Sequence, residues 1–427
     1  MSSTPPTIDE EVFSLEENMI PKDEQPYKIP DNWRWIRLKE VCDGFQYGYT
    51  EKATFEKIGP NFIRITDIRN GIIHDETAPY CKISDSEYLK YKINKDDILI
   101  ARMGSVGENG FAKHDIDGVF ASYLIRLIPK ILPEFVRDYL QSDLYWNQIM
   151  DNSQGTTRLN VNANILKSLI FPLPPLDEQQ RIVDIIESLF AKLDKAKTLA
   201  QNVVDNYELR RLAILHKAFT GQLTKCDFKR MTINSICKSL TYGTSKKSSK
   251  SGKTIVIRMG NLQNGEINWS NLAYSNDDEE IEKYNLSVGD VLFNRTNSAE
   301  LVGKTSIYRG EYPAIYAGYL IKLDYDHNIL IGDYFNYMLN SPEAKNYCQI
   351  VKTDGVNQSN INAKKIGAFE IPLPNINEQK EIVHILDSLL AKEQRTKELA
   401  EQTLQKIDLI KKSILARAFR GELNTKN

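Results

Sequence analysis

The longest regular pattern in the chain is a spacing of apolar residues that alternates between steps of four and three. Neither proline nor glycine interrupts the stretch between Glu178 and Phe219. An average step of about 3.5 residues is typical of a coiled-coil seam, so we predict one unbroken helix of about 60 Å here. The seam residues are Ile182, Ile186, Leu189, Leu193, Ala196, Ala200, Val203 and Tyr207.

The same pattern occurs a second time. Residues 171–223 align without a gap with residues 371–423, an offset of 200 (371 − 171). Each copy opens on Pro-Leu-Pro, continues with Glu-Gln and ends in Ala-Phe-x-Gly-x-Leu. A repeat this long indicates duplicated domains, because solenoid repeats are far shorter. The second seam consists of Ile382, Leu386, Leu389, Ala400, Ile407, Ile410 and Ile414.

The ends of the first helix carry local signals. Pro172 and Pro174 stop any strand and precede a helix start. We predict Asp177 as the N-cap, with Gln180 completing a capping box. Gly221 is the expected C-terminal stop.

Short β-like runs broken by turns precede each helix, which predicts an α+β class for the whole chain. In the first half, strands are expected within 61–68, 97–102, 119–127 and 165–173, and helices within 38–42, 85–91 and 133–150.

The second half repeats this plan with different loops. Residues 256–259 echo 62–65, whereas Thr50–Lys57 does not resemble the lysine–serine loop Ser245–Lys253. We therefore infer that the helices have the same role in both halves, and that the globular domains have related but different roles. The predicted parts are an N-terminal extension (1–29), a first globular domain (30–175), a helical spacer (176–225), a second globular domain (226–375) and a second spacer (376–427).

Composition and charge limit the partners and the compartment that are expected for the chain. The net charge of −2 argues against a protein that is basic all over, although local patches decide what a ligand meets. Five dispersed cysteines without a CxxC pair predict a reducing cytoplasm and no zinc site. No apolar run reaches the roughly 18 residues that span a bilayer. Residues 1–26 are expected to be loosely ordered, with room for a short docking helix at Glu10–Met19.

Catalytic motifs are missing from the sequence. Ser251–Thr254 and Val302–Thr305 carry Gly-Lys-Thr, but Lys247 and Ser298 stand where a phosphate-binding loop needs glycine. The chain has no Asn-Pro-Pro-aromatic run, no GxSxG, GxGxxG or HExxH, and no acidic cluster with two-metal spacing. The sequence therefore indicates a binding or scaffolding protein.

The duplicated architecture resembles the DNA specificity subunit of type I restriction–modification systems. The resemblance covers about residues 30–423. It rests on Phe171–Gln179 with its copy Ile371–Gln379, and on the endings Ala218–Leu223 and Ala418–Leu423.

This resemblance implies a plan for the chain and its partners. Each globular domain would be a target recognition domain that reads one half of a bipartite DNA site. The two helices would pack antiparallel, relate the halves by a pseudo-twofold axis and set the half-site spacing. Two modification subunits would dock on the helical regions, bring S-adenosylmethionine and methylate adenine N6, and a separate motor subunit would cut unmethylated DNA.

The lysine–serine loop is the strongest basic patch. We predict phosphate contacts from its lysines, helped by neighbouring hydroxyl groups, although such loops are more often simply solvated. These residues are Thr244, Ser245, Lys246, Lys247, Lys250 and Lys253. In the first domain the corresponding position is held by Tyr47, Tyr49, Thr50 and Lys52, whose aromatic members could instead be core residues.

Two arginines follow matching strands in the two halves. Arg102 and Arg295 are candidate readers of guanine edges, with a structural salt bridge as the alternative. Arg158 and Gln358, in loops before the helices, are further candidates for DNA contact. Asn160 and Asn360 are shared by both halves and are expected to form turns rather than to read different sequences.

Other interpretations remain open at this point. The seam could pair with a second chain instead of within this one. The chain could also be a coiled-coil scaffold whose globular domains bind proteins. A self-contained enzyme is a third interpretation, which the missing catalytic motifs disfavour.

Overall fold

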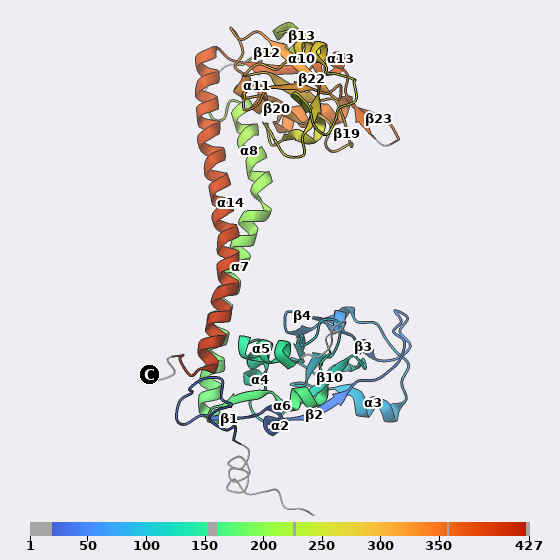
Figure 1. Cartoon of the computed structure of the whole chain (residues 1–427), viewed down its shortest axis with the longest axis vertical. Helices are drawn as coiled ribbons and strands as arrows, with labels where there is room; N and C mark the ends of the chain where they lie inside the picture. The colour runs from blue at the N-terminus through green and yellow to red at the C-terminus, as the bar shows by residue number, and fades with distance from the viewer. Residues whose placement is uncertain (1–18, 153–159, 225–227, 357, 424–427) are drawn as a thin grey trace, which may run out of the picture. The chain divides into compact units, whose positions relative to one another are not determined.

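The computed structural model describes residues 19–152, 160–224, 228–356 and 358–423. The chain forms two compact units, one of Met1–Leu199 with Thr403–Asn427 and the other of Ala200–Gln402. Each unit therefore holds one globular domain together with parts of both long helices (Figure 1).

A six-stranded and a three-stranded sheet build the first globular domain. Their strand orders are β2-β10-β7-β8-β5-β4 and β3-β9-β6, and β1 pairs with β11. The strands are β1 (Arg34–Arg37), β2 (Cys42–Tyr47), β3 (Asn61–Ile63), β4 (Ile68–Arg69), β5 (Ile72–Ile73), β6 (Lys92–Ile93), β7 (Ile98–Ala101), β8 (Asn109–Phe111), β9 (Ile116–Phe120), β10 (Leu124–Pro129) and β11 (Ile170–Leu173). The helices are α2 (Leu38–Val41), α3 (Asp85–Tyr91), α4 (Pro133–Tyr139), α5 (Asp143–Asn152) and α6 (Ala163–Ser168), with short 3-10 turns at Ile65–Asp67 and Asp75–Thr77.

Strand β7, in the middle of the six-stranded sheet, consists of consecutive apolar residues because both of its faces are covered. All four of its residues are buried. Ile98 and Ile100 pack into a cluster with the helices α4 and α5, and Leu99 and Ala101 pack into a second cluster on the other face. Because successive side chains of a strand point to opposite faces, burial on both sides requires apolar residues throughout.

The second globular domain repeats the plan with more breaks. Its sheets have the orders β13-β22-β18-β20, β17-β14-β21, β19-β24-β23, β15-β16 and β12-β25. The strands are β12 (Lys229–Thr232), β13 (Cys237–Tyr242), β14 (Thr254–Ile257), β15 (Leu262–Gln263), β16 (Glu266–Ile267), β17 (Ala273–Ser275), β18 (Val291–Asn294), β19 (Thr296–Asn297), β20 (Thr305–Ile307), β21 (Ala314–Tyr316), β22 (Leu320–Tyr325), β23 (Thr353–Asp354), β24 (Ser359–Asn360) and β25 (Glu370–Leu373). The helices are α9 (Ile233–Ile236), α10 (Asp278–Tyr284), α11 (Gly332–Leu339), α12 (Pro342–Val351) and α13 (Ala363–Gly367), with a 3-10 turn at Met259–Asn261.

The long helices are α7 (Leu176–Asp205), α8 (Tyr207–Phe219) and α14 (Ile376–Phe419). Each domain core contains the first turns of one helix and the last turns of the other. In the first unit Ile182 and Ile186 of α7 share a cluster with Phe419 of α14. In the second unit Ile382 and Leu386 of α14 share a cluster with Phe219 of α8. The helix that follows each globular domain in sequence therefore ends in the core of the other domain.

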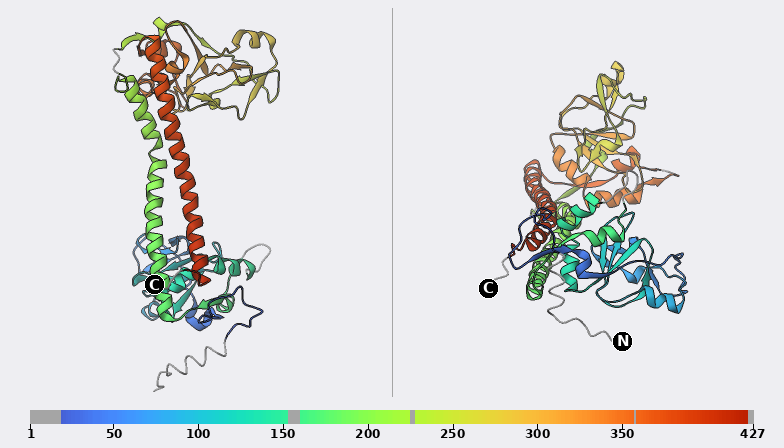
Figure 2. Two further views of the ribbon diagram at one scale, coloured as in Figure 1. Left: turned by 90° about the vertical axis from the view of Figure 1, so that its left-hand side faces the viewer. Right: turned by 60° about the horizontal axis from the view of Figure 1, so that its bottom comes forward.

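Within each unit the two helical segments run antiparallel, as expected (Figure 2). In the first unit Lys197 Nζ lies 3.0 Å from Asp408 Oδ1, and Lys411 pairs with Asp194. In the second unit Arg210 Nε lies 2.7 Å from Glu393 Oε2. The residue numbers of the paired side chains decrease along α14 as they increase along α7 and α8. The helices therefore pair with each other within the chain. All residues of the first seam are buried or half-buried. In the second helix Ile410 is 45% exposed, so this residue does not belong to the seam.

The prediction of one unbroken first helix is wrong at Asn206, which separates α7 from α8 with φ −92° and ψ 6°. Its Nδ2 donates to Asn202 O at 2.8 Å, and Arg210 Nη2 donates to Val203 O at 2.9 Å. Side chains therefore satisfy carbonyl groups next to the break. The second helix continues through the equivalent position.

The predicted cap at Asp177 is also wrong. The helix α7 begins at Leu176, so Asp177 lies inside its first turn. The reciprocal capping box stands in the second copy, where Asn375 Oδ1 accepts from the Glu378 N–H and Glu378 Oε2 accepts from the Asn375 N–H, each at 3.1 Å. Pro175 occupies the matching position in the first copy and has neither group.

Two other boundaries differ from the sequence pattern. The expected strand 165–173 divides into α6 and β11, because Asn162 Oδ1 accepts from two backbone N–H groups and starts a helical turn. The segment from Met19 to residue 26, expected to be loosely ordered, is anchored through one buried residue: the Ile20 N–H donates to Trp35 O at 2.9 Å, whereas most of the other residues are exposed. Residues 1–18, with most of the proposed Glu10–Met19 helix, lie outside the described residues.

The glutamine of each Glu-Gln pair is buried at the start of its helix. Gln379 Nε2 donates to Ile329 O and Pro374 O, both at 2.8 Å, and its Oε1 accepts from the Ile331 N–H at 2.9 Å. Gln179 Nε2 makes one bond, to Pro174 O at 2.9 Å, and its buried Oε1 has no partner among the described residues. Gln379 therefore ties the start of α14 to the residue after β25 and to the segment before α11, whereas Gln179 reaches only the residue after β11.

This difference predicts unequal costs for a matched pair of substitutions. Gln379→Ala leaves buried backbone groups unpaired and should lower the free energy of unfolding by about 2–4 kcal/mol. Gln179→Ala should cost about 1 kcal/mol. Chemical denaturation of the full chain measures both, and equal losses would contradict the assigned bonding.

Candidate nucleic-acid interface

One end of the main sheet carries the same three residues in both domains. Strands β2 and β7 end there and β10 begins there, because β10 is antiparallel to both neighbours. Tyr47 ends β2, Arg102 follows β7 and Tyr123 precedes β10; we call these residues the first cluster. The equivalent strands β13, β18 and β22 give the second cluster, which consists of Tyr242, Arg295 and Tyr319.

In the first cluster the guanidinium group of Arg102 lies over the ring of Tyr47, with 4.7 Å between its Cζ and the ring centroid. The Arg102 N–H donates to Tyr123 O at 3.0 Å, and Arg102 O accepts from the Val161 N–H at 2.9 Å. The Tyr47 hydroxyl accepts from the Ala163 N–H at 3.1 Å. Backbone bonds and a stacked ring thus hold the arginine in place.

The second cluster has the same geometry. Arg295 Cζ lies 4.6 Å from the Tyr242 ring centroid. The Arg295 N–H donates to Tyr319 O at 3.0 Å, its carbonyl accepts from the Ile361 N–H at 2.9 Å, and the Tyr242 hydroxyl accepts from the Ala363 N–H at 2.9 Å. Exposed fractions also match: 38% for Tyr47 and 39% for Tyr242, 53% for Tyr123 and 51% for Tyr319.

A glycine after the first tyrosine permits this geometry. A Cβ on Gly48 would lie 2.3 Å from the carbonyl oxygens of Phe120 and Ala121. A Cβ on Gly243 would lie 2.1 Å from Tyr316 O. No side chain tolerates such distances to backbone atoms, so the repeated Tyr-Gly pair is explained by close packing of two chain segments.

The salt-bridge alternative for the two arginines does not apply among the described residues. Neither Arg102 nor Arg295 has a carboxylate within ion-pair distance there, and the Nε of each is buried without a partner. Arg295 Nη2 donates to Asn360 Oδ1 at 3.3 Å, whereas Asn160 Oδ1, the equivalent atom, has no partner in the part of the chain described. Both domains therefore present a positive charge that no described carboxylate compensates, beside half-exposed tyrosines.

The four lysines of the lysine–serine loop are exposed but not equivalent. Lys246 Nζ lies 2.6 Å from Asp277 Oδ2, and Lys253 Nζ lies 2.8 Å from Asp278 Oδ1, at the start of α10. The hydrogen bond to Asp277 raises the pKa of Lys246, and the same bond lowers the pKa of Asp277. Lys247 and Lys250 have no carboxylate partner among the described residues, which leaves them as the loop's available cations.

The hydroxyl residues beside these lysines differ in exposure. Ser245 is exposed, whereas Thr244 is buried and its Oγ1 accepts from the Lys246 N–H at 3.1 Å. In the first domain Thr50 and Lys52 are exposed. Tyr49 is half-buried, and its hydroxyl donates to Glu87 Oε2 at 3.3 Å, which ties it to α3. DNA contact by any of these residues stays a prediction.

Gln358 is exposed in the turn that joins β23 to β24, a hairpin visible beside β19 in Figure 1. Arg158, its counterpart in the first domain, lies outside the described residues. Asn360 forms part of β24 and donates to Thr296 Oγ1 at 2.8 Å, which supports a structural role in place of base reading.

Sequence reasoning selected Tyr47 and both arginines but missed Tyr242, Tyr123 and Tyr319. The signal was present, because Tyr-Gly and Tyr-Leu-Ile recur at equivalent places in the two halves. Repetition alone did not show that the three positions meet at one end of a sheet.

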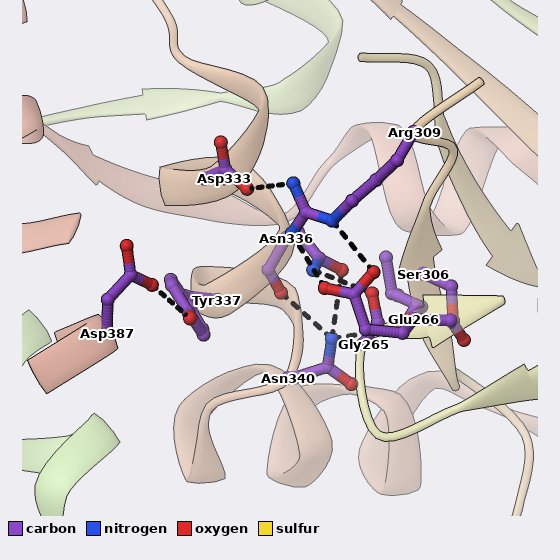
Figure 3. A network of polar contacts seen from close by, with 10 residues as sticks. Gly265, Glu266, Ser306, Arg309, Asp333, Asn336, Tyr337, Asn340 and Asp387 are labelled. Atoms are coloured by element: carbon purple, nitrogen blue, oxygen red, sulfur yellow. Dashed lines mark hydrogen bonds and ion pairs between the residues drawn. The ribbon is translucent and has the colours of Figure 1, made fainter. Parts of the chain in front are cut away.

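A polar network fixes the β15–β16 hairpin to α11 in the second domain (Figure 3). Asn336 Nδ2 donates to Gly265 O at 2.9 Å. Arg309 bridges Glu266 at 2.6 Å and Asp333 at 2.9 Å. These contacts hold the hairpin, the segment after β20 and α11 together.

The same helix is also bonded to a long helix. Tyr337 of α11 donates to Asp387 of α14 at 2.6 Å (Figure 3), and burial raises the pKa of this tyrosine. In the first domain Arg137 of α4 lies 3.2 Å from Glu187 of α7, at the position equivalent to Asp387. Each globular domain is thus joined to its following helix by a polar contact as well as by its core.

Neither a metal-binding group nor a membrane-spanning helix occurs in the part of the chain that the structure describes. No group of three or more His, Cys, Asp or Glu side chains there could hold a metal ion. No helix in the described part of the chain is long and apolar enough to cross a membrane.

Comparison with known proteins identifies the family. The family model for the type I restriction modification DNA specificity domain matches residues 30–203 and 226–406. These two matches cover well over half of the chain. The protein therefore belongs to this family and carries its domain twice.

Individual relatives agree over almost the whole length. The type I restriction enzyme EcoKI specificity subunit of Escherichia coli (strain K12) is 28% identical over 425 residues, which are 93% of this chain and 90% of that protein. The StySPI specificity subunit of Salmonella potsdam is 26% identical over 423 residues, with the same shares of 93% and 90%.

Solved structures have the same fold. The crystal structure of the HsdS subunit from Thermoanaerobacter tengcongensis superposes with a TM-score of 0.63 at 22% identity, over 94% of this chain and 100% of that one. A chain from a study of complex assembly and conformational transition in a type I R-M system gives 0.69 at 22% identity, over 93% and 100%.

The lysine–serine loop yields a prediction with an internal control. Lys247→Gln with Lys250→Gln should weaken duplex DNA binding and reduce the slope of log K against log salt by about two, because two free cations are lost. Lys246→Gln with Lys253→Gln should change the slope by less than one, because carboxylates already engage both groups. Binding titrations over a range of salt concentrations test this, and equal slopes for the two variants would refute it.

Proposed function

We propose that this chain is the DNA-recognition subunit of a type I restriction–modification complex and that each globular domain reads one half of a bipartite duplex site. The observation that carries this proposal is a contrast between the two units. Their helices, cores and clusters repeat, whereas the loops at Thr50–Lys57 and Ser245–Lys253 differ in sequence and charge. Two domains that recognise different DNA sequences on the same scaffold require repeated structural elements together with loops that differ.

The long helices serve two purposes in the proposal. A stiff helical pair makes the gap between half-sites part of the recognised sequence, because half-sites at another separation cannot both be engaged. The helical regions also dock two modification subunits, one for each half of the duplication. The restriction motor subunit joins the same complex, which works on DNA in the cytoplasm.

The chemistry is assigned to the partners. The modification subunits bind S-adenosylmethionine and methylate adenine N6, and this chain supplies no catalytic group. The lack of an Asn-Pro-Pro-aromatic run and of the other catalytic motifs in the sequence supports this division. The chain's contribution is to place the partners at a chosen sequence.

A coiled-coil scaffold whose globular domains bind proteins is the second candidate, because helices paired within the chain would serve it equally well. It predicts no salt-dependent binding to duplex DNA. The two candidates therefore separate in one binding titration.

The modular proposal predicts the outcome of a domain exchange. Lys229–Leu373 is a suitable block, because it contains both β12 and β25 and keeps their pairing within the transplanted part. Replacing it with the corresponding block of another family member should change one half of the methylated site and leave the other half and the gap unchanged. Sequencing of methylated bases provides the readout.

The reciprocal exchange of the first domain, from Arg34 to Leu173, is the matched control, since β1 and β11 pair in the same way. It should change the other half only. A change in both halves from either exchange would rule out independent reading.

A further inference from the structure

We propose that the two clusters are matching clamps for the DNA sugar-phosphate backbone, and that Arg102 and Arg295 hold phosphates instead of reading guanine. This inference rests on the proposed function and specifies how each domain is anchored on its half-site. From sequence alone both arginines are candidate readers of guanine edges, with a structural salt bridge as the alternative.

The first step is the identity of the two clusters. The stacking distances are 4.7 and 4.6 Å, the backbone bonds correspond one for one, and the tyrosines are exposed to matching extents. A residue that reads bases should differ between domains that read different half-sites. A feature that is the same in both fits a ligand that is the same at both half-sites, and the DNA backbone is such a ligand.

The second step is the chemistry of the polar groups in the two clusters. Each cluster offers a guanidinium group with no carboxylate partner in the described part of the chain. The Tyr47 and Tyr242 hydroxyls accept a backbone N–H, which leaves their own hydrogen free to donate. The Tyr123 and Tyr319 side chains are about half exposed. Donors and positive charge without a neighbouring acid match a phosphate, which accepts hydrogen bonds and is negative.

The third step is rigidity. The arginine is fixed through its own N–H and carbonyl, and its planar group lies against an aromatic ring. Ordering is therefore complete before DNA arrives, so little entropy is lost on contact. Loops of different sequence adjoin the clusters, at Thr50–Lys57 after Tyr47 and at Ser245–Lys253 after Tyr242. A fixed anchor beside a variable loop sets the register in which that loop meets the bases.

The test uses the full chain, with a selected specific duplex and a duplex of random sequence. Arg102→Gln combined with Arg295→Gln should weaken binding to both duplexes by similar factors and reduce the salt slope by about two, without changing the selected bases. Arg69→Gln is the matched control, because Arg69 is exposed on β4, at the opposite edge of the sheet from β2. It should leave both affinities nearly unchanged.

A second double variant alters the two clusters with a smaller change in the side chains, so that an effect on binding can be distinguished from a loss of folding. Tyr123→Phe with Tyr319→Phe removes only two exposed hydroxyls that make no hydrogen bond among the described residues. This variant should keep the wild-type melting temperature and lose about tenfold in affinity for both duplexes.

The outcomes separate the two levels of the proposal. If the wild-type chain binds neither duplex, the proposed function itself fails. If the wild type binds with a steep salt dependence and both cluster variants match it, the clamp is refuted. A changed base preference in one half-site would show base reading, and lost assembly with a modification subunit at unchanged DNA affinity would show a protein contact; either result also refutes the clamp.

Discussion

The architecture depends on the burial of both ends of each long helix. Phe419, at the end of α14, packs against Phe135 and Tyr139 of the first domain, with ring centroids 5.2 and 5.9 Å apart. Phe219, at the end of α8, packs against Tyr334 of the second domain at 5.3 Å. Fully burying such a side chain contributes on the order of 2–3 kcal/mol, so each domain is stabilised by a helix that belongs to the other half of the sequence.

Charged side chains supplement the apolar seam residues of the long helices. Arg210 pairs with Glu393, Lys397 lies over the Tyr207 ring at 4.8 Å, and Lys411 lies over the Phe190 ring at the same distance. Such contacts fix direction and register more than they add stability. Glu393, which stands between the apolar seam residues Leu389 and Ala400, is therefore one of the residues that pair the helices.

Sequence pattern predicted the class of fold and the duplication, because both depend on long-range periodicity and on repeated motifs, whereas the antiparallel packing of the helices was expected from the family resemblance. It failed where a single side chain decides. Asn162 turns an expected strand into a short helix, Asn206 and Arg210 accommodate a helix break, and Pro175 removes the capping box that Asn375 provides in the other copy. These are local hydrogen bonds with no periodic signal.

The candidate interface was predicted only in part for a similar reason. Residue type selected Tyr47, Arg102 and Arg295, but strand order was needed to show that the tyrosines at 47, 123, 242 and 319 join them in two equal clusters. Charge counting also overstated the lysine–serine loop, since Asp277 and Asp278 approach it from a helix that follows it by more than twenty residues.

The most direct measurement is single-molecule sequencing of methylated bases in cells with and without this gene. Two domains on one helical frame predict methylated adenines in a two-part motif with a constant gap, and the motif should disappear when the gene is deleted. An unchanged methylation pattern, or the loss of a continuous motif without a gap, would contradict the central claim that this chain reads two half-sites at a fixed separation.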